Sequence, residues 1–155
     1  MGADLSSLMT IRGWAAGIAA AAVLWAALPV AAQPAFVIVV NKENPITSIT
    51  IVELQRIFRK QTRMWPHAES IVPVDWVATS ELREAFCRQV LGRSVREMAE
   101  FWVQQSITQG LAPPSTQRSA RAILRFVASV PGAISYVAPA DVDDSVKTIK
   151  LAGTS

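Results

Sequence analysis

Apolar residues occur along the chain in two patterns: short continuous runs, which are typical of buried strands, and stripes at helical spacing. The segment 36–40 reads Phe-Val-Ile-Val-Val, and an unbroken β-branched run of this length is typical of a buried strand. Largely apolar runs at 71–74 and 133–137 predict two further strands, and a last strand is predicted near 146–151. Pro73 lies in the first of these runs. Because proline cannot donate to the strand ladder, that strand is expected at a sheet edge or to end there.

Four helices are predicted from N-cap residues that precede apolar stripes. Two of the caps have a glutamate three positions later, the capping-box pattern. The predicted N-caps are Thr50, Ser80, Ser94 and Ser119. Gly92 and Gly110 are expected to end the second and third helices, because glycine adopts the left-handed conformation of a helix end at little cost.

The order of these elements is β-α-β-α-α-α-β-β, which predicts an α/β fold with a mixed sheet flanked by helices. The segment 111–117 contains Pro113-Pro114 and is expected to be an irregular connection. Pro131-Gly132 predicts a type II turn before the third strand.

The N-terminal 32 residues have the pattern of a secretory signal peptide. Arg12 precedes an apolar stretch at 15–28, Pro29 follows, and small residues at 30–32 suit a cleavage site. The alternative is an uncleaved membrane anchor, because the stretch is nearly long enough to span a bilayer. The first interpretation gives a leader at 1–32, one domain at 33–155, and a periplasmic location.

Charge and composition narrow the classes of function. The net charge is +3, without a block of consecutive Lys or Arg, so a nucleic-acid partner is not expected. Cys87 is the single cysteine and falls beside Phe86 and Val90 in the predicted helix 81–91, which favours a buried thiol. Membrane contact is expected only through an uncleaved leader.

The sequence offers no catalytic constellation. His67 is the single histidine and lies in a turn-like Trp-Pro-His-Ala segment. Asp141, Asp143 and Asp144 lack the glycine and terminal glutamate of a calcium loop and are interpreted as a solvated loop. We therefore expect neither an enzyme nor a cofactor or metal site.

Several short motifs, in order along nearly the whole of 33–155, resemble those of the phosphate-binding-protein-like family. They are 39–41 with Asn44-Pro45, Leu54 with Ile57-Phe58, Trp65, Ile71 with Pro73-Val74, Arg83 with Phe86, 90–92, Trp102 and 131–137. The resemblance implies a periplasmic solute-binding fold of two α/β lobes, of which this chain supplies one. It also implies a role as receptor for an ABC phosphate importer.

The same resemblance assigns a ligand-binding segment at the second predicted helix. The family places an Arg four residues before a Ser-Gly-Thr run there. With Ser80 matched to that Ser, Trp76 occupies the Arg position, and Glu81 and Leu82 replace Gly and Thr. What remains for an oxyanion is Thr79, Ser80, the N–H groups of the helix start, and Arg83 one turn further.

Two functions stay open. In the first, the chain binds phosphate or another small oxyanion through Thr79, Ser80 and Arg83, with Trp76 beside them. In the second, it is an accessory protein whose former ligand face, with an exposed Trp76, docks a membrane sensor or importer component. The alternative reading of Ser80 and Arg83 is an ordinary helix cap and an ordinary ion-pair residue.

Overall fold

In the described part of the chain, six strands form one mixed sheet in the order β2-β6-β1-β5-β3-β4. The computed structural model describes residues 33–153, so the expected leader at 1–32 lies outside the described residues. The strands are β1 (Val37–Val40), β2 (Ser48–Thr50), β3 (Val72–Trp76), β4 (Ser115–Gln117), β5 (Ala133–Val137) and β6 (Lys147–Ala152). β1 runs antiparallel to both its neighbours, β5 and β6, whereas β3 is parallel to β4 and β5.

The helices begin at the four N-caps that the sequence predicts. They are α1 (Ile51–Phe58), α2 (Glu81–Phe86), α3 (Val95–Gln109) and α4 (Ala120–Ser129), with a π-helical turn η1 (Cys87–Leu91) continuing α2 and a 3₁₀ turn η2 (Pro139–Asp141) after β5. Both capping boxes are formed, and Gly92 and Gly110 end η1 and α3 with φ near 65°. No described helix is long and apolar enough to cross a membrane.

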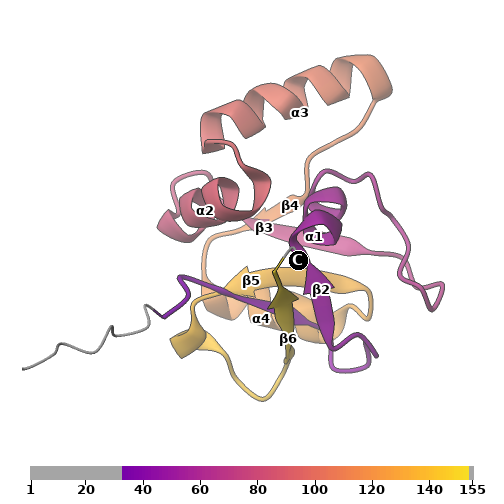
Figure 1. Cartoon of the computed structure of the whole chain (residues 1–155), viewed down its shortest axis with the longest axis vertical. Coiled ribbons are helices and arrows are strands. Elements are labelled where there is room, and N and C mark those ends of the chain that lie inside the picture. Colours follow the sequence, from indigo (N-terminus) through magenta and orange to yellow (C-terminus); the bar gives the residue numbers. More distant parts are fainter. Residues whose placement is uncertain (1–32, 154–155) are drawn as a thin grey trace, which may run out of the picture. The chain divides into compact units, whose positions relative to one another are not determined.

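The crossover connections place helices on both faces of the sheet. The chain passes outward from β3 to β4 through α2 and α3, and then returns past β3 to β5 through α4. Since parallel crossovers are right-handed, these opposite directions put α2 and α4 on opposite faces. In Figure 1, α1 and α2 lie on the upper side of β5, whereas α4 lies on its lower side and is partly hidden by the strands. This arrangement confirms the predicted mixed α/β sheet.

Aromatic rings fill the space between the sheet and the α1–α2 layer. Tyr136 of β5 stacks on Phe86 of α2 with ring centroids 3.9 Å apart. Phe36 and Phe58 meet both rings edge-on or tilted. Cys87 is fully buried in this core, as the sequence predicts. Trp102 is also buried, whereas His67 is exposed in its turn, beside Trp65.

Two strands were not predicted, and each has only three residues. β4 lies within 111–117, so the prediction that this whole segment is irregular is wrong. β3 is also not an edge strand, because β4 pairs with its carboxyl half. Pro73 is tolerated because pairing with β4 begins only at Val74.

The turn before β5 has a different geometry from the predicted type II. That type requires positive φ at Gly132, and the positive-φ glycines of the described chain are Gly92 and Gly110. Gly132 instead serves a close approach, since a Cβ there would lie 1.7 Å from the carbonyl oxygen of Ser70.

Candidate ligand-binding edge of the sheet

The carboxyl ends of β3 and β4 lie side by side, and the chain leaves them toward opposite faces (Figure 1). In open α/β sheets, diverging connections of this kind leave a crevice where ligands bind. The backbone N–H of Val77 donates to the carbonyl oxygen of Gln117 at 3.1 Å and ties the two loops together. The starts of α2 and α4 therefore meet one edge of the sheet.

The start of α2 differs from the other described helix starts. Thr50, Ser94 and Ser119 accept a hydrogen bond from their own helix through the side-chain oxygen, whereas Ser80 makes no side-chain cap bond. Ser80 is partly exposed, and Thr79 beside it is exposed. Because the first N–H groups of a helix have no acceptor within it, polar groups remain available at this edge.

Arg83 does not reach toward this edge as the oxyanion prediction requires. Its side chain is 10% exposed, and its Nη1 lies 2.6 Å from Oδ2 of Asp75. The same Nη1 donates to the carbonyl oxygen of Trp76 at 2.7 Å. The guanidinium is thus held by the end of β3, which corresponds to the ion-pair alternative for this residue.

Asp75 is the centre of a buried polar network that sequence reasoning missed. The Tyr136 hydroxyl donates to its Oδ1 at 2.5 Å, and the N–H of Trp76 donates to the same oxygen at 2.8 Å. Burial raises the pKa of Asp75, while the charge of Arg83 opposes that rise. Burial and the neighbouring Asp75 raise the pKa of Tyr136. The sequence signal that could have revealed this network is a carboxylate at the end of an apolar strand, because a buried carboxylate needs a hydrogen-bonding or charged partner.

Trp76 is buried, and the prediction that its ring is exposed is wrong. It is 7% exposed, and its Nε1 donates to the carbonyl oxygen of Tyr136 at 2.8 Å. The indole therefore cross-links β3 and β5 and is not a free anchor for a ligand or a partner. Of the four residues expected to bind ligand, Thr79 and Ser80 are accessible. Trp76 of β3 and Arg83 of α2 are instead engaged in contacts that hold the end of β3.

A hollow of about 620 Å³ adjoins the crevice on the α3 side. Its walls are mainly apolar, and Arg83, Ser106 and Thr116 are the polar residues that line it. Val103 and Ile107 of α3 line it too, although they remain 60% and 77% exposed. The size and lining are typical of a site for a small or extended apolar ligand.

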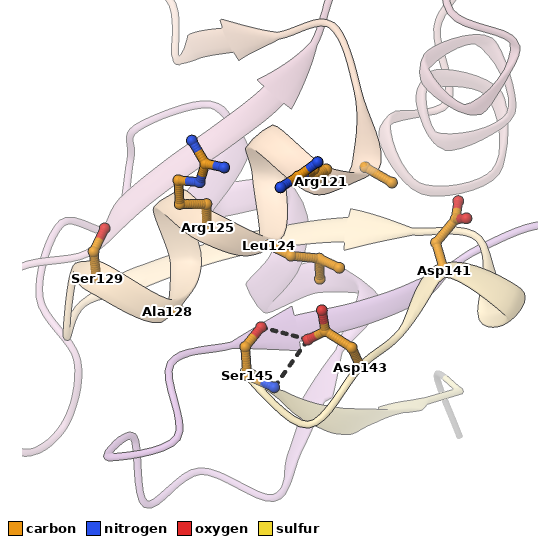
Figure 2. Close-up of a pocket in the computed structure, with 9 residues that line it drawn as sticks. Arg121, Leu124, Arg125, Ala128, Ser129, Asp141, Asp143 and Ser145 are labelled. Atoms are coloured by element: carbon orange, nitrogen blue, oxygen red, sulfur yellow. Dashed lines mark hydrogen bonds between the residues drawn. The ribbon is translucent and has the colours of Figure 1, made fainter.

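A second hollow of about 660 Å³ lies between α4 and the segment 141–145, which begins at the last residue of η2. Figure 2 shows Arg121 and Arg125 on α4, with Asp141 and Asp143 on the facing segment. The carboxylate of Asp143 accepts from the N–H of Ser145 at 2.9 Å, so it is engaged locally. Because acids and bases line this hollow together, it offers an anion no net attraction.

Comparison with known proteins gives the fold. No protein-family model matches the chain. A phosphate transport receptor of ABC type from Vibrio cholerae matches with TM-score 0.56 and 24% identity over 76% of this chain. A putative phosphate ABC transporter substrate-binding protein with bound phosphate, from Clostridium perfringens, matches with TM-score 0.58 and 24% identity over 76%. PstS from Borrelia burgdorferi matches with TM-score 0.59 and 14% identity over 76%.

These matches cover 46%, 44% and 47% of the three receptors, so the chain spans about half of their length. The first is described as a transport receptor and the second as a substrate-binding protein, and none of the three is described as an enzyme. The chain accordingly has the α/β fold of substrate-binding proteins of phosphate ABC transporters, in a single-lobe form.

Proposed function

We propose that the chain is an extracytoplasmic solute-binding module that binds phosphate or a similar small oxyanion and presents it to an ABC importer. The observation that carries this proposal is the pair of helix starts at the carboxyl ends of β3 and β4. The Clostridium perfringens protein of the same fold was solved with phosphate bound. Residues 1–32 would direct the export.

In this proposal Thr79 and Ser80 contact the anion, together with N–H groups at the start of α2. Trp76 and Arg83 contribute by holding the end of β3 in place through their bonds to Tyr136 and Asp75. Because Asp75 balances the charge of Arg83, attraction must come from N–H dipoles and hydroxyl groups. A single lobe leaves the ligand open to water, so we expect weak affinity.

Calorimetric titration of the purified protein with phosphate at low salt tests this function. The variant Thr79→Ala/Ser80→Ala should abolish the saturable heat. The matched control is Thr47→Ala/Ser48→Ala. It alters a second Thr-Ser pair, which is exposed at the start of β2, and should leave binding unchanged. Absence of saturation at millimolar phosphate in the unaltered protein would exclude the oxyanion function.

The hollow beside α3 favours a second candidate, an accessory protein that docks an importer or sensor component. Val103 and Ile107 are large apolar side chains exposed next to each other on one helix, and such residues mark contact surfaces. Val103→Glu/Ile107→Glu should then abolish co-purification with that membrane component. The Thr79→Ala/Ser80→Ala variant should retain it.

A further inference from the structure

A basic hollow lies at the far ends of α1 and α3, separate from the β3–β4 edge. Three cations line it, together with three side-chain amides from the same loop and from the end of α3. They are Arg59, Lys60 and Arg63, and Gln61, Gln105 and Gln109. Its volume is about 470 Å³, and no described residue that lines it is an aspartate or glutamate.

The three cations have carbonyl partners but no carboxylate. Arg59 donates to the carbonyl oxygen of Leu91 at 2.8 Å, and Lys60 donates to that of Pro113 at 3.3 Å. Arg63 donates to the carbonyl oxygen of Lys60 at 3.3 Å. The ion pairs found in the described part of the chain involve Arg83, Arg88 and Arg96 instead. Three positive charges thus face one hollow without a counter-charge.

The pKa values of two of these cations are lowered, as expected for neighbouring positive charges without a counter-charge. Burial lowers the pKa of Arg59, and the charge of Arg93 lowers it further. Burial also lowers the pKa of Lys60, with a further contribution from Arg63. Like charges kept this close repel one another, and a bound anion would relieve that repulsion.

Lys60 also occupies a position that glycine would fill more easily. It directly follows the C-cap of α1 with φ 55°, in the left-handed region where a Cβ is strained. The backbone N–H of Lys60 donates to Ile57 and closes the helix end. The chain therefore places an ammonium beside the hollow at a site where the backbone favours a residue without a side chain.

We propose that this hollow binds a ligand with two or more linked phosphate groups. Guanidinium forks pair with phosphate oxygens in two-pronged contacts, and an ammonium adds a point charge. Three separated cations match a chain of charged groups better than a single phosphate, and the hollow has the size of a small-molecule site. The glutamine amides donate further hydrogen bonds.

Calorimetric titration of the purified protein with pyrophosphate, tripolyphosphate and orthophosphate tests this site. Pyrophosphate should bind saturably, and raising the salt concentration should weaken it. Lys60→Gly and Arg63→Gln should each weaken it about tenfold by removing a charge-assisted contact. Adenosine diphosphate tests whether the ligand is an inorganic or an organic phosphate. An affinity equal to that of pyrophosphate means that the linked phosphates alone are recognised, and a higher affinity means that the organic group contributes.

Two control variants make the outcome decisive. Arg121→Gln/Arg125→Gln removes two exposed cations from α4, where Asp141 and Asp143 share the hollow, and should leave binding within twofold. Thr79→Ala/Ser80→Ala should also leave pyrophosphate binding unchanged, which separates this site from the oxyanion edge. Equal weakening by the α4 control, orthophosphate binding as tightly as pyrophosphate in the Thr79→Ala/Ser80→Ala variant, or no saturation would overturn the proposal. Arg63 is exposed, so its variant tests the site without disturbing the core.

Discussion

Two regions of this molecule hold cations in opposite surroundings. At the β3–β4 edge, Arg83 is buried and lies 2.6 Å from Asp75. At the ends of α1 and α3, Arg59, Lys60 and Arg63 share a hollow that no carboxylate lines. The edge matches the fold's expected ligand position, yet its charge is already balanced. The comparison teaches that the surroundings of a cation, more than its place in the fold, decide whether an anion is attracted.

Replacing Arg83 with methionine should give the largest effect, because it leaves Asp75 buried without its partner. Breaking such a pair costs about 3–5 kcal/mol of unfolding free energy. Urea denaturation followed by circular dichroism measures the loss. The control is Arg88→Met, which breaks the exposed pair with Glu84 on the same helical stretch and should cost about 0.3–0.5 kcal/mol. Equal losses in the two variants would show that the burial of Arg83 has no energetic consequence.

Tyr136→Phe should have the next largest effect. It removes the hydroxyl that donates to Asp75 but keeps the ring stacked on Phe86. Leaving a buried carboxylate oxygen with one donor fewer should cost about 1–3 kcal/mol. The same urea titration measures it, and Phe86→Leu serves to separate ring packing from hydrogen bonding. A Tyr136→Phe variant as stable as the unaltered protein would mean that the hydroxyl contributes nothing to the network.

The elements could be predicted because their signals are local. The capping boxes at Thr50 and Ser94 involve residues three apart, and both form as expected. The buried strand β1 is an unbroken apolar run, and β5 is interrupted only by Ser135. The three-residue strands β2 and β4 could not be predicted, since their pairing depends on partners that lie far away in the sequence.

The candidate binding sites could be predicted only in part, because they depend on the orientation of side chains in the tertiary structure. Sequence places Arg83 one turn into a helix, but not that it folds back onto Asp75 at the end of the preceding strand. The basic hollow is harder still. Its cations follow α1, whereas Gln105 and Gln109 come from the end of α3, some distance along the chain. Only the tertiary structure brings these two segments together.

The buried thiol of Cys87 makes the stability of the protein depend on pH. Burial raises the pKa of Cys87 from 9.0 to about 11. Between these values the native thiol keeps a proton that the unfolded chain releases, so unfolding free energy falls as pH rises from about 9 toward 11. Below pH 9 this contribution is constant. Urea titrations across this range should show a steeper decline than in Cys87→Ala, and matching slopes would contradict the shift.

Lys60→Gly should give the smallest change in unfolding free energy. Whether stability rises or falls is the informative result. Glycine relieves the left-handed strain at φ 55° but adds freedom to the unfolded chain, so we expect a net gain of about 0.5 kcal/mol. Ala68→Gly is the matched control, because Ala68 has φ 64° and lies outside the basic hollow. Both variants should unfold at higher urea, yet only Lys60→Gly should lose pyrophosphate affinity. A fold that gains stability while a site loses its ligand is the signature of a residue kept for binding. Were Lys60→Gly to lower stability, the lysine would instead be holding the end of α1 through its bond to Pro113.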